Sequence, residues 1–397
     1  MNTKKIVIIG ILLYALSSVS SYFLFANVLG GKILQAPVPD ATRDADGNVT
    51  FDDSLPKTQP CPLNGALYSK QQEKWWQEHR PLGIMVENST DARPQSGISF
   101  ADVIYEAVAE GGITRFLAVY HCQDAEFVGP VRSARTYFLD FISEYGDYPL
   151  YTHVGGANCD PSTGSGCANG AKADALGQIR KYGWGRYNDL DQFGVPCPIL
   201  CRYEDRLPNR AIEHTMYTGT TKLWDFAKEQ RELTNVDADG NKWDKNFQSY
   251  TFKDDAQVNS RPAAQTVTFD FWDGYKDFNV QYKYDKNTNT YLRSNGGKAH
   301  TDLNTEKQLA PKNVVVLFMT ESKANDGYPG NLHMLYGTIG TGNASVFMDG
   351  KEIKAKWNKK TRTAKLLLTD TAGKEIALNR GQIWFSVVSP DTTVEVN

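Results

Sequence analysis

Three clusters of polar residues in the first half of the chain carry side chains that could bind a ligand or move a proton. They lie at residues 91–97, 106–115 and 129–135. In the third cluster, a Gly-Pro pair precedes Arg132, Ser133 and Arg135, and apolar residues at helical spacing follow from 135 to 145. Free amides at a helix start and arginine side chains both favour anions, so this spacing predicts a phosphate or carboxylate site with Ser133 as the helix cap.

A structural interpretation of the same arginines is open as well. In it, Ser133 only caps the helix, and the arginines pair with Asp140, Glu144 or Glu110. The other two clusters add polar side chains near the ends of expected strands. The predicted ligand-binding set is Arg93, Gln95, Arg115, Arg132, Ser133 and Arg135.

Three residues are candidates for proton transfer, namely Glu110, His153 and His214. His153 precedes Gly155-Gly156, where a backbone can approach a ligand closely. No nucleophile elbow, zinc-protease motif or nucleotide-binding fingerprint occurs, so whether the chain is an enzyme is left open. We predict no cofactor and no metal site. In the enzyme hypothesis alone, Asp102 would be a possible metal contact.

The elements expected to position these clusters are of mixed type. Residues 80–87, 114–120, 127–131 and 149–154 read as strands, 101–108 as a strand or a short helix, and 135–145, 171–182 and 220–230 as helices. From residue 264 onward the pattern is β, with expected strands at 266–271, 279–284, 313–318, 344–347, 364–368 and 383–388. The sequence therefore predicts an α+β region (mixed α/β) followed by a mostly antiparallel β region.

The N-terminus predicts a single transmembrane helix. Lys4 and Lys5 precede an uncharged apolar run at 6–29, and about 20 apolar residues are enough to cross a bilayer. The lysines place the bulk of the chain outside the cytoplasmic membrane. An uncleaved anchor and a cleaved signal peptide both fit this run. The predicted organisation is an anchor at 1–29, a linker at 30–60, an α/β domain at 61–230, a linker at 231–262 and a β-rich domain at 263–397.

An even number of cysteines in an exported chain suggests disulfides. The six are Cys61, Cys122, Cys159, Cys167, Cys197 and Cys201. Short loops favour Cys159–Cys167 and Cys197–Cys201, which leaves Cys61 with Cys122. A zinc site is the weaker alternative, because no pair has the C-x-x-C spacing.

Composition excludes several classes of protein. The 43 basic and 46 acidic residues give a net charge of -3, which argues against a nucleic-acid binder. A hydrophobic content of 41% is ample for a folded core, so disorder of the whole chain is excluded.

The order of several motifs resembles the YerB-like family of bacterial lipoproteins, whose function is unknown. The motifs are ARPQSG at 92–97, ADVIYE at 101–106, EGGITRF at 110–116, GPVRSAR at 129–135 and HVGG at 153–156. CPLNG at 61–65 is similar too, as are YKYD at 282–285, YLR at 291–293, NVVV at 313–316 and GQIW at 381–384. The resemblance implies an envelope location and two domains, and it supplies no activity.

The chain departs from the family pattern at two points. The family is usually anchored through a lipid-bearing cysteine, and no cysteine follows the apolar run here. Thr215 stands where the family usually has Asn after the histidine. An uncleaved helix is therefore expected to replace the lipid anchor, and a role for His214 is less secure.

Three functions fit these features. The first is an envelope-facing protein that binds an anionic ligand, such as a cell-wall polymer or lipid-linked precursor, in a cleft of the first domain. The second is an enzyme on such precursors, a phosphotransferase or hydrolase, for which envelope phosphotransferases of the LytR type are only an analogy. The third is a scaffold that binds another envelope protein through the β-rich domain.

Overall fold

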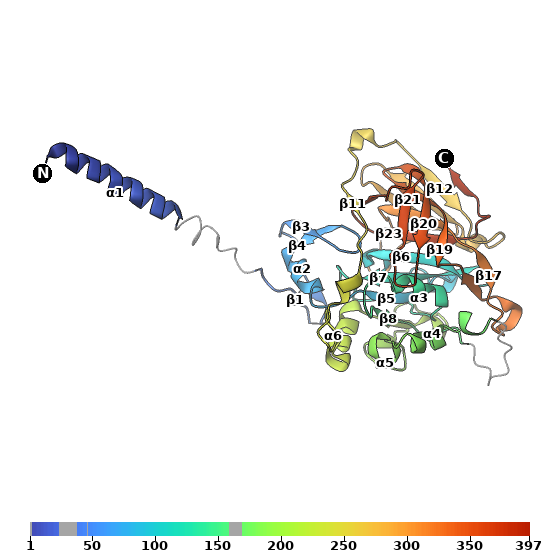
Figure 1. Cartoon of the computed structure of the whole chain (residues 1–397). Coiled ribbons are helices and arrows are strands. Elements are labelled where there is room, and N and C mark those ends of the chain that lie inside the picture. The colour runs from blue at the N-terminus through green and yellow to red at the C-terminus, as the bar shows by residue number, and fades with distance from the viewer. Residues whose placement is uncertain (1, 24–37, 46, 159–168) are drawn as a thin grey trace. The chain divides into compact units, whose positions relative to one another are not determined.

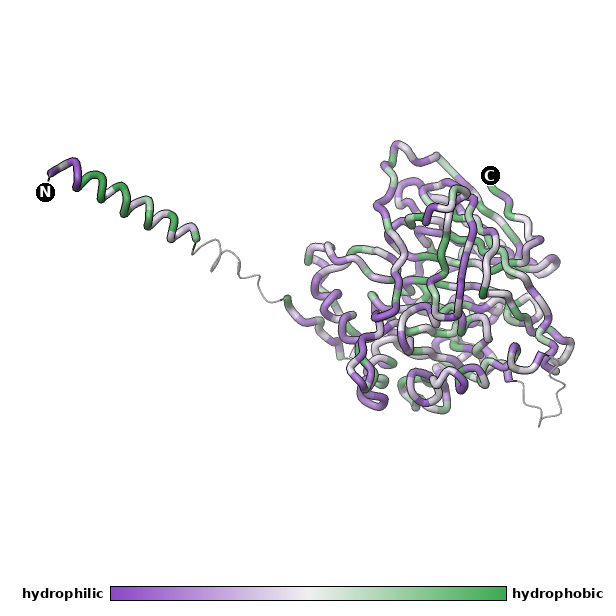
Figure 2. Tube along the Cα trace, in the orientation of Figure 1, coloured by the Kyte–Doolittle hydropathy of each residue, from purple (hydrophilic) through white to green (hydrophobic). Residues whose placement is uncertain are grey.

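The computed structural model describes residues 2–23, 38–45, 47–158 and 169–397. It divides into two compact units, Met1–Asp40 and Ala41–Asn397. The first contains helix α1 (Thr3–Phe23), whose described side chains are exposed. Figure 2 shows that most of the helix is hydrophobic. Lys4–Phe23 is long and apolar enough to cross a membrane, a property that signal sequences share. Residues 24–29, the rest of the predicted run, lie outside the described residues.

The second unit is built on a sheet of nine strands (Figure 1). In spatial order they are β21 (Leu367–Asp370), β20 (Lys351–Lys359), β19 (Gly340–Met348), β16 (Asn313–Phe318), β23 (Ile383–Val388), β6 (Val103–Glu110), β7 (Ile113–Tyr120), β5 (Leu82–Glu87) and β8 (Leu150–Thr152). Every residue of β5 and β23 is buried, as expected for strands covered on both faces.

The two regions expected from the sequence share this sheet. Strand β23 pairs in parallel with β6, from Ile383↔Val103 to Ser386↔Glu106. It also pairs in parallel with β16 on its other side. The mixed α and β class is confirmed, but the second half is less antiparallel than expected. The linker expected at 231–262 separates two regions of the sequence, but strands from both regions belong to the nine-stranded sheet.

A second sheet of five antiparallel strands comes from the C-terminal half. Its order is β15 (Lys298–Ala299), β14 (Thr290–Asn295), β13 (Val280–Asp285), β12 (Thr266–Phe269) and β24 (Val394–Val396). Buried and exposed residues alternate in β13, because one face packs on the core and the other meets water.

Helices cover the region around β8 and the edge of the nine-stranded sheet (Figure 1). They are α2 (Lys70–Trp76), α3 (Thr136–Ile142), α4 (Ala175–Lys181), α5 (Gly185–Asn188) and α6 (Thr220–Arg231). Ser69 and Gln72 form a reciprocal capping box at the start of α2. Helices α3 and α4 are shorter than the sequence predicted, whereas α6 agrees closely.

Short strand pairs complete the unit. They are β1 (Thr42–Arg43) with β2 (Val49–Thr50), β3 (Lys57–Pro60) with β4 (Leu67–Ser69), β9 (Leu200–Arg202) with β10 (Met216–Thr218), β11 (Phe252–Lys253) with β22 (Leu378–Asn379), and β17 (Glu321–Lys323) with β18 (Met334–Tyr336). The predicted linker at 30–60 therefore contains ordered strands. It also contacts the body of the unit, because Arg43 pairs with Asp225 at 2.7 Å.

Two of the expected disulfides are present. Cys61 bonds to Cys122, and Cys197 bonds to Cys201. Cys159 and Cys167 lie outside the described residues.

Candidate functional site

A pocket of about 510 Å³ lies beside the end of the β6–β7 hairpin. Segments far apart in the sequence line it: Glu110, Arg115, Arg132, Ser133, Arg135, Gly156, Ala157, Asn158, Asp326, Gly327, Tyr328 and His333. We call it the arginine pocket. Four predicted ligand-binding residues meet there, namely Arg115, Arg132, Ser133 and Arg135.

Glu110 lies between two arginines of the arginine pocket. Its carboxylate accepts from Arg115 at 2.8 Å and from Arg135 at 2.7 Å. Burial favours the neutral acid, but Arg115, His333 and Arg135 together outweigh it and lower the pKa of Glu110. The glutamate is therefore held as a carboxylate. Arg115 and Arg135 therefore share one carboxylate charge inside the protein.

The C-terminal half supplies the opposite side of the arginine pocket. His333 Nδ1 lies 2.7 Å from Asp326, and its Nε2 lies 3.2 Å from the Glu110 carboxylate. The ring of Tyr328 stacks on His333 with centroids 3.8 Å apart. The amide of Gly111 also donates to the carbonyl of Leu332. These contacts hold the 326–333 segment against the β6–β7 hairpin.

Arg132 differs from the other two arginines. Its Nε lies 2.9 Å from the carboxylate of Glu87, which also accepts from His214 Nδ1 at 2.9 Å. Its side chain is 23% exposed, and among the described residues nothing accepts from its two terminal NH₂ groups. The hydroxyl of Ser133 likewise has no hydrogen-bond partner within the described chain. This arginine can therefore donate to an external anion from the edge that carries its two NH₂ groups.

His153 lies outside the residues that line the arginine pocket. Its Nδ1 is 2.6 Å from the carbonyl of Gly155, and its Nε2 is 2.9 Å from Asp189. Burial opposes a charge there, but the hydrogen bond and charge of Asp189 raise the pKa of His153. Both ring nitrogens are occupied, so the side chain holds the 153–155 turn in place.

Arg93 and Gln95 belong to a different cluster, centred on Glu106, which we call the Glu106 cluster. Glu106 accepts from Arg293 at 2.8 and 2.9 Å and from the indole of Trp384 at 3.0 Å. Gln95 accepts from His300 Nε2 at 2.7 Å. Arg93 donates to the side chain and the carbonyl of Asn88. The expected single cleft is therefore wrong for these two residues.

The environment of His300 in the Glu106 cluster fixes its tautomer. Burial, Arg293 and Arg93 lower the pKa of His300 well below its usual range, so the ring is neutral. The guanidinium of Arg293 can only donate, so Nδ1 of His300 accepts from it and Nε2–H donates to Gln95.

The expected helix cap is also wrong. Helix α3 begins at Thr136 after Arg135, and no side chain caps it. Of the carboxylates considered for the arginines, only Glu110 pairs with them. Asp140 accepts from Thr338, and Glu144 pairs with Lys359 at 2.8 Å. The arginine pocket thus depends on side chains brought together by the β6–β7 hairpin and not on a helix end.

Asp102 is buried beside the Cys61–Cys122 disulfide. It accepts from the amides of His121 at 2.7 Å and Cys122 at 3.0 Å, and burial raises its pKa to about 7. Because both sulfurs are bonded to each other, these atoms do not fit a metal ion. Asp102 instead satisfies the backbone around the disulfide.

Two domains of one protein family match most of the chain. The "Protein of unknown function (DUF3048) N-terminal domain" matches residues 68–234, and the corresponding C-terminal domain matches residues 267–385. The chain belongs to the DUF3048 family. These ranges lie close to the two regions predicted from the sequence.

A curated relative and a solved structure that resemble this DUF3048 chain are the same protein. The chain is 29% identical to "Putative lipoprotein YerB" of Bacillus subtilis (strain 168) over 341 residues, 85% of this chain and 89% of the relative. The crystal structure of YerB from Bacillus subtilis matches with a TM-score of 0.63 at 24% identity, covering 85% of this chain and 99% of that one. The resemblance stated from the motifs is confirmed, and the family description names no function.

Sequence reasoning missed the part of the arginine pocket that the C-terminal half supplies. Asp326, Tyr328 and His333 belong to no sequence motif that includes the arginines. His333 is 223 residues from Glu110 in the sequence. Glu87 was also missed, although its place at the end of a buried strand was a signal. A charged residue that closes an apolar run often faces a polar site.

Proposed function

We propose that this DUF3048 chain is a membrane-anchored envelope protein whose bulk lies outside the cytoplasmic membrane and binds a phosphate- or carboxylate-bearing ligand in the arginine pocket. The observation that carries the proposal is the free terminal NH₂ groups of Arg132 beside the Ser133 hydroxyl, in a pocket of about 510 Å³. A guanidinium with two open NH₂ groups is well suited to bidentate contact with an anion.

Binding is favoured over proton chemistry by the state of the catalytic candidates. Glu110 is held ionised by two arginines, and His153 has both nitrogens engaged. His214 donates to Glu87. A general base needs a free lone pair within reach of its substrate. Of the three, only Glu110 lines the arginine pocket, and there it pairs with Arg115 and Arg135.

The test is calorimetry of the full-length chain in detergent, with inorganic phosphate and citrate as probes. Arg132→Ala is expected to weaken binding about tenfold, the equivalent of about 1.4 kcal/mol. Arg186→Ala, an exposed arginine outside the pocket, is the matched control and should change nothing. Equal affinity of Arg132→Ala and the natural chain would overturn the proposal.

The envelope location rests on separate support. Helix α1 is long and apolar enough to span a bilayer, two lysines lie at its N-terminal end, and disulfides form in oxidising compartments. Alkaline phosphatase fused after residue 397 should be active in cells, because that enzyme needs an oxidising compartment. Mass measurement of the purified chain separates an intact anchor from a cleaved signal peptide.

A further inference from the structure

A pocket of about 440 Å³ lies beside the Cys61–Cys122 disulfide, and none of the residues that line the arginine pocket contributes to it. The residues on either side of Cys61 line this pocket, as does the residue before Cys122, so the disulfide joins two parts of its lining. The other parts come from helix α2 and from the segment at 235–247, within the expected linker. We call it the tryptophan pocket, because Trp76 and Trp243 line it.

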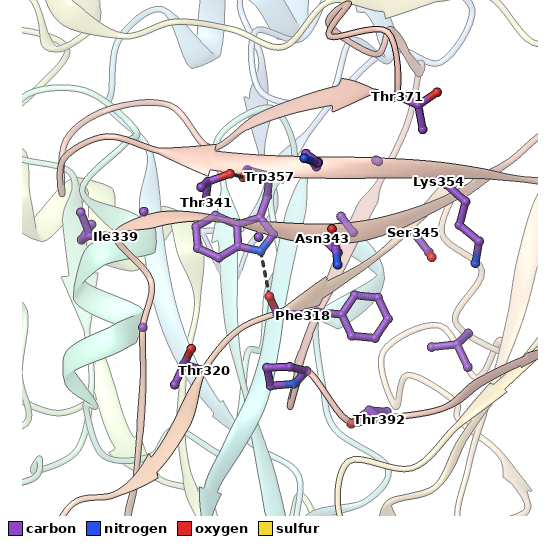
Figure 3. A pocket seen from close by; sticks show the side chains of 18 residues that line it. Phe318, Thr320, Ile339, Thr341, Asn343, Ser345, Lys354, Trp357, Thr371 and Thr392 are labelled. Atoms are coloured by element: carbon purple, nitrogen blue, oxygen red, sulfur yellow. Dashed lines mark hydrogen bonds between the residues drawn. The ribbon is translucent and has the colours of Figure 1, made fainter.

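The two tryptophans of this pocket have indole N–H groups without an acceptor. Trp76 is 4% exposed and Trp243 is 6% exposed, yet neither indole nitrogen has a hydrogen-bond partner among the described residues. A Cβ added at Gly146 would lie 2.6 Å from Cε3 of Trp243, so the opposite edge of that indole, which carries the N–H, points away from Gly146. In a larger groove of about 810 Å³, the indole of Trp357 instead donates to the Phe318 carbonyl at 2.9 Å (Figure 3). Because buried donors are nearly always paired in this way, the two in the tryptophan pocket are available to a ligand.

His121 adds a third ring whose nitrogens are unused. It lines the tryptophan pocket and is 1% exposed, and neither its Nδ1 nor its Nε2 has a hydrogen-bond partner within the described part of the chain. Burial and the neighbouring His79 lower the pKa of His121 well below its usual range, so the ring is neutral. A neutral imidazole has one N–H donor and one acceptor nitrogen. His121 can therefore bond to a hydroxyl group, which also donates and accepts.

The walls of the tryptophan pocket favour a neutral ligand with some apolar surface. Phe247 packs against Trp243 with ring centroids 5.2 Å apart, and two prolines also line the pocket. The charged residues there are Glu73, Lys242 and Asp244, so the pocket has no excess of positive charge to attract an anion. The unpaired N–H groups disfavour a cation, because their dipoles present positive ends. An apolar wall with a few convergent polar groups is typical of a small-molecule site.

We propose that the tryptophan pocket binds an N-acetylated amino sugar of a neutral glycan. The acetamido carbonyl, which has two lone pairs, supplies the acceptor that the indole N–H groups of Trp76 and Trp243 lack. A sugar hydroxyl bonds to His121, and the acetamido methyl and the C–H face of the sugar ring pack on the apolar walls. The amides of Gln77 and Asn235 bond to further hydroxyls. This site is independent of the arginine pocket, and neither proposal requires the other.

The first test leaves the protein unchanged and compares three trisaccharides by calorimetry. Chitotriose, cellotriose and the deacetylated glucosamine trimer are titrated into the full-length chain in a polyoxyethylene detergent, which has no sugar headgroup to compete. Chitotriose should bind in the range of about 10–500 μM. The other two should bind at least about tenfold more weakly, because they lack the acetamido carbonyl. Equal binding of cellotriose, or no binding of chitotriose at about 5 mM, would overturn the proposal.

The second test alters the tryptophan pocket. Trp76→Phe and Trp243→Phe each keep an aromatic ring but remove one N–H, and each should weaken chitotriose binding about tenfold. Trp75→Phe is the matched control, because Trp75 also lies in α2 but does not line the pocket, and its affinity should be unchanged. Gln77→Trp tests the site without altering a buried residue. Gln77 is exposed, and a larger ring there obstructs the pocket, so binding should fall at least about tenfold while the urea midpoint stays the same.

Three further outcomes would overturn the proposal. Unchanged affinity in both Trp76→Phe and Trp243→Phe means that the indole N–H groups bind only water. Displacement of chitotriose by tetramethylammonium chloride identifies the tryptophan pocket as a cation site built from aromatic rings. Loss of chitotriose binding in Arg132→Ala, with binding intact in Gln77→Trp, places the sugar in the arginine pocket.

Discussion

Strand β6 carries two glutamates, four positions apart, that both pair with arginine in different surroundings. Glu106 and Arg293 are fully buried, and their side chains are 0% exposed. Glu110 is 23% exposed and lies in the arginine pocket with Arg115 and Arg135. The same chemical pair thus occurs once inside the protein and once at a surface where a ligand can reach it.

The difference shows what each pair can do. Around Glu106, the partners come from both halves of the chain, and the indole of Trp384 and the guanidinium of Arg293 occupy its oxygens. That cluster joins the two halves, and the Glu106 carboxylate is fully paired within the protein. Around Glu110, the neighbouring Arg132 keeps open donors. We therefore assign stability to the Glu106 cluster and binding to the arginine pocket.

Glu106→Gln should have the largest effect on stability. It leaves the charge of Arg293 buried without a counter-charge, and removing one partner of a buried pair costs about 3–5 kcal/mol. The free energy of unfolding from urea titration, followed by tryptophan fluorescence, should fall by that amount. Glu352→Gln, at the exposed pair with Lys354, is the control and should cost less than about 1 kcal/mol. Similar losses of unfolding free energy in Glu106→Gln and Glu352→Gln would show that the buried Glu106–Arg293 pair is no more important for stability than an exposed pair.

Glu110→Gln should destabilise the protein less and change binding more. The pair is partly solvated, so a loss of about 1–3 kcal/mol is expected from its charged hydrogen bonds. Removing the internal carboxylate also leaves Arg115 and Arg135 free for a ligand. Affinity for inorganic phosphate should therefore rise by about tenfold in calorimetry. If affinity is unchanged, those two arginines do not contribute to the ligand site.

Local patterns predicted much of the fold, but not its strand partners. The strand expected at 279–284 is found as β13, and the one expected at 344–347 lies within β19. Strands β23 and β6 are buried almost throughout and show no alternation of buried and exposed residues, so nothing local in them encodes which strand lies beside which. Local sequence patterns therefore could not predict that the two halves of the chain share one sheet.

The candidate site shows the same limit. The run from 129 to 135 brought Arg132, Ser133 and Arg135 together because they are neighbours in sequence. Arg93 was grouped with them for its charge, yet its position relative to the pocket depends on the contact with Asn88 and on the carbonyl of Asp277. Charge type is readable from a sequence, whereas the pairing of charges across 200 residues depends on the tertiary fold.

The dependence of stability on acid pH tests the contribution of the Glu110 carboxylate in the arginine pocket. The pKa of Glu110 is lowered in the folded state, so its contribution to stability is complete above the unfolded value of about 4.3 and is lost as the pH falls further. The difference in unfolding free energy between the natural chain and Glu110→Gln should narrow between about pH 5 and pH 2. A difference that does not change with pH would mean that the carboxylate charge is not what stabilises the pocket.

The His153–Asp189 pair gives the smallest and most selective test of the comparison, because it is buried like the Glu106 cluster but titratable like a pocket residue. Asp189 raises the pKa of His153, so the stabilisation is complete below the unfolded value of about 6.5 and is lost as the pH rises through the folded value. The stability advantage of the natural chain over His153→Gln should therefore be larger at about pH 5.5 than at about pH 9. Phosphate affinity should be the same in both proteins, since His153 does not line the arginine pocket. If phosphate affinity changes and the stability difference does not depend on pH, His153 acts in the ligand site and not as a structural residue.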